Sequence, residues 1–228
     1  SDLWVRDLDT GTDTFLFDGV DYLDSFSWTP DGNRIVFDHS CGIYVIDRDG
    51  GNLQQLVDDW PPGGNDCSND APHVNRVDGR LSWVQWDLGL AVSDADGQNP
   101  YLVPNTWVPD AFPVWSPDGE WIAFFDWAQV YKIRPDGTGR TQLTALGGAD
   151  WVEVTGAWTA DGRWIISVLN IAGDSRLYKV ATDGSGTMLP YDIAPGADPW
   201  YVGSVGAFPL FEDGFESGGT SAWSSAVP

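Results

Sequence analysis

One pair of tight turns recurs four times along this sequence at nearly constant spacing. The first turn of each pair ends in Asp-Gly and lies at 28–32, 75–79, 115–119 and 158–162; the second is a variant of D-x-D-G and lies at 47–50, 94–97, 134–137 and 181–184. Each Asp-Gly supplies the positive φ that a strand-to-strand turn requires, and the flanking runs are rich in β-branched and aromatic residues. A period of roughly 40 to 47 residues with four strands per unit predicts the blades of a β-propeller.

The third copy of the repeat is the most complete. Its sequence at 112–124, F-P-V-W-S-P-D-G-E-W-I-A-F, resembles the TolB-type, WD-like β-propeller repeat, as does G-I-Y-V-I-D-R-D-G-G at 42–51. The resemblance extends from Asp2 to about Leu189 and is weakest in the second copy, where V-N-R-V-D at 74–78 lacks the Trp, Ser and Pro. It implies the fold more than the function, because propellers of this type serve as binding platforms, as partners in envelope complexes and as gating domains of peptidases.

The two ends of the sequence predict how the ring closes. The first residues align with 42–51, so the chain starts with the two outer strands of a blade, and F-P-L-F-E-D-G-F at 208–215 resembles a shortened inner hairpin. Pairing these segments would remove both exposed sheet edges. We therefore predict an all-β propeller of five four-stranded blades. Its single domain spans 1–215, with blades at about 25–57, 69–103, 111–144 and 154–190, a closing blade from 1–17 plus 201–215, and a tail at 216–228. A segment cut from a longer propeller is the alternative.

Charge and the tail indicate where such a domain works. The chain has 34 acidic and 11 basic residues, a net charge of -23, which repels phosphate backbones and anionic lipid surfaces. We expect no nucleic-acid partner and no membrane insertion, since no apolar stretch is long enough to cross a bilayer. The segment at 213–224, D-G-F-E-S-G-G-T-S-A-W-S, resembles the C-terminal end of many secreted bacterial proteins.

Cys41 and Cys67 are the two cysteines of the chain. In a four-stranded meander the loops that hold them emerge on the same face, so we predict a disulfide between them, stabilising by about 3 kcal/mol. Two independent buried thiols are the alternative. An oxidised pair would indicate a periplasmic or extracellular protein.

Binding residues of a propeller lie in the loops between blades and between the second and third strands, opposite the Asp-Gly turns. An aromatic residue occurs in every inter-blade loop, interleaved with aspartates. Exposed aromatic rings beside carboxylates suit sugar rings or cationic and aromatic protein groups. The predicted partner-binding residues are Tyr22, Trp60, Trp86, Trp107, Trp127, Trp151 and Trp200. The alternative is that these rings only fill gaps between blade tops, as Trp28, Trp115 and Trp158 of the repeat are expected to do between neighbouring blades.

Two functions fit this pattern. The first is a secreted or periplasmic non-catalytic binding or assembly module for a protein, peptide or carbohydrate, with self-association included. The second is a propeller-type carbohydrate-active enzyme, a glycosidase or polysaccharide lyase, whose carboxylate pair would lie near the axis. We predict no catalytic residues, because His39 and His73 lie in different blades and no G-x-S-x-G occurs. We also predict no cofactor and no metal, since the D-x-D-G turns lack the remaining ligands of a calcium loop; a weak calcium site among the loop aspartates stays open.

Overall fold

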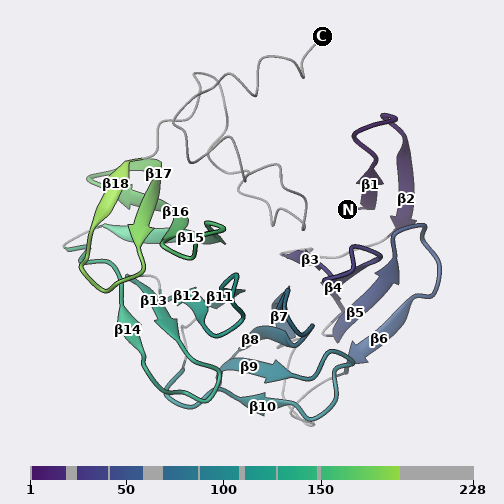
Figure 1. Ribbon diagram of the computed structural model, residues 1–228, viewed down its shortest axis with the longest axis horizontal. Helices are drawn as coiled ribbons and strands as arrows, with labels where there is room; N and C mark the ends of the chain where they lie inside the picture. The colour runs from purple at the N-terminus through teal and green to yellow at the C-terminus, as the bar shows by residue number, and fades with distance from the viewer. Residues whose placement is uncertain are drawn as a thin grey trace.

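A computed structural model describes residues 2–18, 25–40, 42–58, 69–86, 88–107, 111–126, 128–147 and 150–190; for 111, 151 and 153–155 it describes the backbone only. Every regular element in these ranges is a β-strand. The strands form separate sheets that follow one another around a ring (Figure 1).

Four of the sheets contain four antiparallel strands each, in the order of the chain. The β3–β6 sheet contains β3 (Phe26–Trp28), β4 (Arg34–His39), β5 (Gly42–Asp47) and β6 (Gln54–Val57). The β7–β10 sheet contains β7 (Asn69–Val74), β8 (Leu81–Gln85), β9 (Gly89–Ser93) and β10 (Tyr101–Leu102). The β11–β14 sheet contains β11 (Ala111–Trp115), β12 (Ile122–Phe125), β13 (Val130–Ile133) and β14 (Thr141–Gln142). The β15–β18 sheet contains β15 (Trp151–Trp158), β16 (Trp164–Ile171), β17 (Asp174–Ala181) and β18 (Met188–Pro190).

A fifth sheet contains β1 (Leu3–Arg6) and β2 (Asp13–Phe17), which pair with each other beside the β3–β6 sheet (Figure 1). The first strand of each four-stranded sheet lies nearest the axis in Figure 1 and the fourth lies at the rim. The predicted all-β, five-bladed propeller is confirmed. The strands at 201–215 that we expect to complete the fifth blade lie outside the described residues.

Three of the four first turns owe their geometry to a hydroxyl and a carboxylate, whereas Asn75 takes the place of the hydroxyl residue in the turn at 75–79. The Thr29 hydroxyl donates to Asp31 at 2.6 Å, and Thr159 donates to Asp161 at the same distance. In the first of these turns, hydrogen bonds from Thr29 and Asn33 lower the pKa of Asp31 to about 2. The glycine that follows the carboxylate has a positive φ in all four first turns, as predicted.

The core fills the spaces between neighbouring sheets, which we call the seams. Trp115 is 4% exposed and packs with residues of the β7–β10 and β11–β14 sheets. Trp158 packs against the same cluster and donates its indole N–H to the Val114 carbonyl oxygen at 3.0 Å. Trp28 packs against the cluster shared with Leu3 and Leu16 of the first sheet. The three repeat tryptophans therefore pack between blades, as predicted.

Side chains of the inner strands also link the sheets by hydrogen bonds. The backbone N–H of Val74 donates to the Ser27 hydroxyl at 3.1 Å, and the backbone N–H of Trp115 donates to His73 Nδ1 at 3.3 Å. Burial, with a smaller contribution from the charge of Arg76, lowers the pKa of His73 to about 3. The His73 ring is therefore neutral at physiological pH, which leaves Nδ1 free to accept this bond.

Candidate functional site

The inner strands β7 and β11 share an irregularity at the end where each strand begins. Ala71 and Phe112 both have a φ of 51°, which is uncommon for residues other than glycine, and the pairing of each strand with its neighbour shifts register there. Such a bulge bends the strand and redirects side chains, and bulges of this kind are common beside functional sites. This end of the strands is also where the loop between β8 and β9 lies, because Asn69 pairs with Gln85.

Asp70 lies at the bulge of β7, and two hydrogen bonds fix its carboxylate. One oxygen accepts from the backbone N–H of Ala71 at 2.7 Å, and the other accepts from the indole N–H of Trp86 at 3.0 Å. An ionised carboxylate can accept about four hydrogen bonds, so these two leave acceptor capacity for a ligand. Because Asp70 is only partly buried, this capacity is open to an incoming donor.

Two aromatic residues lie at this end of the inner strands: Trp86, which follows β8, and Phe112 at the bulge of β11. Trp86 and Phe112 are partly buried and pack against one hydrophobic cluster, and β11 packs against both β7 and β8. Phe112 stacks on Phe125, with ring centroids 5.6 Å apart. We call Asp70, Trp86 and Phe112 the Asp70 cluster: an oriented carboxylate on inner strands, bordered by aromatic carbon.

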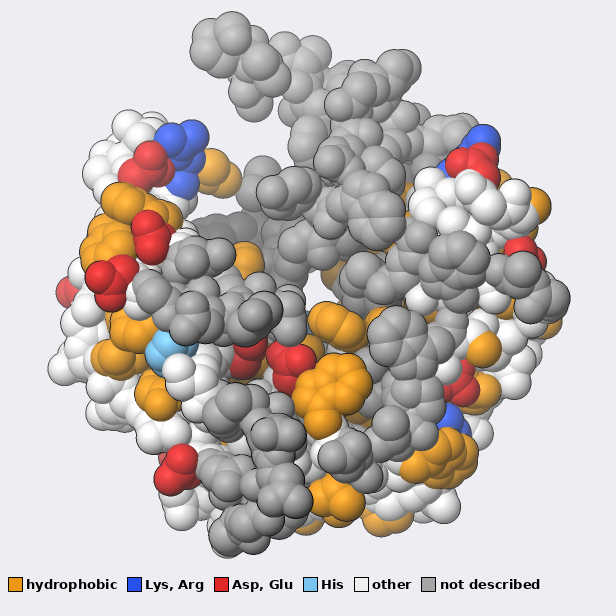
Figure 2. Space-filling model, turned by 180° about the vertical axis from the view of Figure 1, so that it is seen from behind, with side chains coloured by type: hydrophobic (Ala, Val, Ile, Leu, Met, Phe, Trp, Pro, Cys, Tyr) orange, Lys and Arg blue, Asp and Glu red, His pale blue; other side chains and the backbone are white. Residues whose placement is uncertain are grey.

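Figure 2 shows the ring from the side opposite to Figure 1. Near the centre of this face, acidic side chains lie beside hydrophobic ones, and the other hydrophobic side chains are scattered. A surface of this composition can accept hydrogen bonds and cations while it offers apolar contact.

Trp107 follows β10 and is 54% exposed. The Arg140 guanidinium stacks on its ring, 4.3 Å from the centroid, and also donates to the carbonyl oxygen of Asn105 at 2.8 Å. The same guanidinium lies 4.5 Å from the ring of Tyr131. Trp107 is therefore held at the seam between the β7–β10 and β11–β14 sheets, with part of its surface open to solvent.

The structure places three of the predicted site residues. Trp86 belongs to the Asp70 cluster, Trp107 lies at a seam, and Trp151 begins β15, where only its backbone is described. Tyr22, Trp60, Trp127 and Trp200 lie outside the described residues, and so do both members of the predicted disulfide, Cys41 and Cys67. The predicted loop-face site is thus described at Trp86 and Trp107.

The sequence analysis did not single out Phe112 or the pairing of Asp70 with Trp86. Both depend on the bulges. A glycine in the sequence indicates a positive φ, but nothing comparable in the sequence indicates one at Ala71 or Phe112. The one hint was the proline that follows each bulged residue, at 72 and 113.

In the described part of the chain, no three His, Cys, Asp or Glu side chains gather closely enough to hold a metal ion. A search of these same ranges for a long apolar helix that could cross a membrane also finds none. Neither finding bears on the aspartates of loops that lie outside these ranges.

The ring of antiparallel sheets defines the fold as a TolB-like β-propeller. No family model matches the chain. An uncharacterized protein of Agrobacterium fabrum is 26% identical over 183 residues, a match that covers 75% of this chain and 58% of that protein. The chain thus spans less than two thirds of the length of this relative.

Two solved structures share the fold. A protein from Agrobacterium tumefaciens assigned as TolB gives a TM-score of 0.67 at 18% identity, over 83% of this chain and 68% of its own. A chain of the nidogen–laminin complex gives a TM-score of 0.62 at 16% identity, over 82% of this chain and 71% of its own. At such identities the similarity establishes the fold alone.

Proposed function

We propose that this propeller is a non-catalytic binding or assembly module that presents its loop face to a protein or peptide partner. The observation that carries the proposal is the Asp70 cluster, in which two hydrogen bonds, one of them from Trp86, orient a carboxylate. A fixed carboxylate beside aromatic carbon suits a lysine or arginine side chain, because the charge is paired while the aliphatic stem packs on the rings.

The charge of the whole chain supports the same partner. A net charge of -23 raises the local concentration of cationic partners and speeds their association. The solved neighbour from the nidogen–laminin complex is a propeller found in a complex of proteins. A periplasmic or extracellular location is part of the proposal and rests on the TolB-like fold and on the predicted disulfide.

The proposal is tested by selecting partners from a random peptide library displayed on phage, with the full chain as bait. We expect the selected peptides to contain Lys or Arg beside an aromatic residue. Asp70→Asn should then lower the affinity for a selected peptide by about 10- to 100-fold, the usual range for a hydrogen bond to a charged group. Isothermal titration calorimetry with the synthetic peptide measures the change.

A matched control separates the site from overall charge. Asp96→Asn removes the same charge from an exposed turn, where the carboxylate accepts only a backbone N–H from Gln98 at 3.2 Å. It should leave the affinity within about twofold. Equal effects of Asp70→Asn and Asp96→Asn, or selected peptides without basic residues, would contradict the proposal. Turnover of a polysaccharide that Asp70→Asn abolishes would instead favour the carbohydrate-active enzyme.

A further inference from the structure

One seam of the ring lacks the tryptophan that the equivalent seams contain. In the β3–β6 and β11–β14 sheets the inner strand ends in Trp28 and Trp115, which pair with Ile35 and Ile122. In the β7–β10 sheet the residue in the same register is Val74, which pairs with Leu81. Because this copy of the repeat has valine at that position, the seam between the β3–β6 and β7–β10 sheets contains a much smaller side chain there.

The neighbouring seam shows what the tryptophan does. Trp115 is almost completely buried, and the Arg80 guanidinium lies 4.8 Å from the centroid of its ring. Arg80 comes from the preceding sheet, directly before β8. At this seam an indole therefore packs between two sheets with a cation over its ring.

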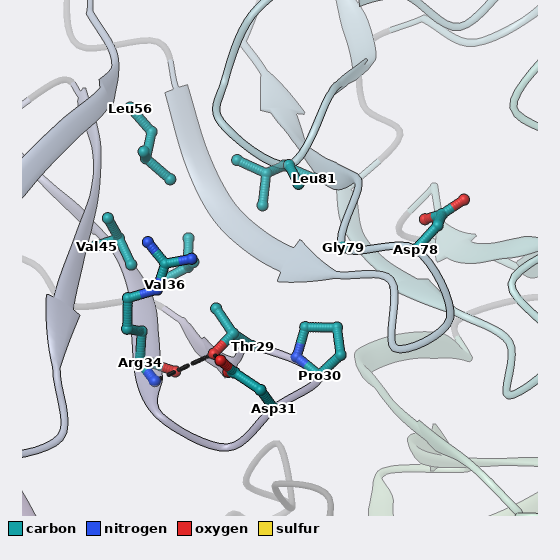
Figure 3. Close-up of a pocket in the computed structure, with 11 residues that line it drawn as sticks. Thr29, Pro30, Asp31, Arg34, Val36, Val45, Leu56, Asp78, Gly79 and Leu81 are labelled. Carbon is teal, nitrogen blue, oxygen red and sulfur yellow. Dashed lines mark hydrogen bonds between the residues drawn. The ribbon is translucent and has the colours of Figure 1, made fainter.

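The seam with Val74 contains a cavity of about 230 Å³, lined by Val36, Val45 and Leu81 of the cluster to which Val74 belongs, but not by Val74 itself. These three lining side chains are buried and belong to its apolar wall. Figure 3 shows Val36, Val45 and Leu56 on one side of this space and Leu81 on the other, with Pro30 near the turns.

Another large side chain of this seam leaves the cavity open. Trp83 is fully buried in the cluster that contains Val74, but its indole N–H donates to Asn69 at 2.9 Å, at the opposite end of the inner strand. Trp83 does not line the cavity.

Arg34 occupies the position of Arg80 in the preceding sheet, because each directly precedes the residue that pairs with the end of the inner strand. It lines the cavity, and in Figure 3 its side chain lies along Val36 and Val45. Asp31, held by Thr29 and Asn33, lies at the edge of the same space. The cavity thus has apolar walls, a cation for the face of a ring and an acceptor at its edge.

We infer that this cavity binds the indole ring of a tryptophan that a polypeptide partner presents to the face that carries the Asp-Gly turns. Its volume suits one ring system, and its lining includes Arg34, which corresponds to the arginine over the ring of Trp115. Apolar cavities of about 150 Å³ in other proteins bind single aromatic rings. The Asp-Gly turns at Pro30 and Gly79 line the same cavity, so the backbone attached to such a ring would lie beside them. This site is separate from the loop face of the proposed function and does not depend on it.

Fluorine NMR with N-acetyl-5-fluoro-L-tryptophanamide tests the inference on the full chain. We expect saturable binding to the wild-type protein. Val74→Trp should weaken binding by at least 10-fold and raise the melting temperature, because a tryptophan in the register of Trp115 would extend toward Arg34 and compete with the probe. If Val74→Trp does not fold, as judged by near-UV circular dichroism, Val74→Phe should give the same loss of binding.

The two arginines provide a matched pair. Arg34→Gln should lower the affinity for the probe by about 2- to 5-fold, which corresponds to the loss of an exposed cation–π contact. Arg80→Gln removes the same group from a seam that already contains its tryptophan; because Arg80 also pairs with Asp78 of the cavity lining at 2.7 Å, its effect on probe binding should be smaller than that of Arg34→Gln. The inference is overturned if the wild-type protein shows no saturable binding, if binding survives both Val74 substitutions, or if Arg34→Gln and Arg80→Gln act alike.

Discussion

At the scale of single residues, His73 makes one seam sensitive to acid. Its Nδ1 accepts the backbone N–H of Trp115, whereas the corresponding acceptor at the preceding seam is the Ser27 hydroxyl. Protonation of the imidazole would convert this acceptor into a donor and place a charge in a buried site. Both seams are bridged by a backbone N–H that donates to the preceding inner strand, but only the acceptor at His73 can be protonated as the pH falls.

The resulting prediction concerns the pH dependence of stability. The pKa of His73 is about 3 in the folded protein and near 6.5 when unfolded, so the unfolded state binds the extra proton first. The contribution of His73 is therefore complete above pH 6.5 and is lost as the pH falls toward 3, by at most about 1.4 kcal/mol per pH unit. His73→Asn, which offers an amide oxygen as acceptor, should flatten this slope in urea unfolding measured from pH 7 to 4. Parallel curves for both proteins would contradict the prediction.

At the scale of elements, the D-x-D-G turns do more than reverse the chain. A Cβ added at Gly97 would overlap the carbonyl oxygen of Leu56, and one added at Gly137 would lie 2.6 Å from the carbonyl oxygen of Pro104. Both contacts reach the preceding sheet. The glycine is therefore required for close packing at the seam as well as for its positive φ.

Two glycine substitutions separate these roles. A Cβ added at Gly162 would lie in open space. Gly162→Ala should therefore lower the free energy of unfolding only by the strain of a positive φ, roughly 1 to 2 kcal/mol. Gly137→Ala should destabilise by at least about 1 kcal/mol more, because it also overpacks the seam against Pro104. Chemical denaturation of both variants gives the comparison. Equal losses would mean that the seam at Pro104 relaxes without cost.

The elements differ in how well the sequence predicts them. Asp-Gly turns and alternating apolar runs are local signals, so the strands around Gly32, Gly119 and Gly162 could be predicted. The bulge at Ala71 depends on pairing with β8 and on packing against the next sheet, which no short segment encodes. The partnership of Asp70 with Trp86 follows from that bulge, so the site could be predicted only as a set of loop aromatics.

At the scale of the whole molecule, ring closure leads to a further prediction. Among the described strands, β1 and β2 pair only with each other, and their inner neighbours are expected from 201–215. A chain that stops at Tyr201 should then leave a sheet edge exposed and either aggregate or lose several degrees in melting temperature. Differential scanning calorimetry and light scattering measure both effects. An unchanged melting temperature would show that the ring does not need this segment.

The strand order of the four-stranded sheets has a consequence for synthesis. Each of these sheets pairs strands that are consecutive in the chain, so its contacts close loops within about one repeat. The β3–β6 sheet can therefore pair while later residues are still on the ribosome, and each following sheet forms beside a completed neighbour. Strands that are distant in the sequence pair only when the predicted closing strands reach the start of the chain. Translation would then build the ring blade by blade, with closure as its last step.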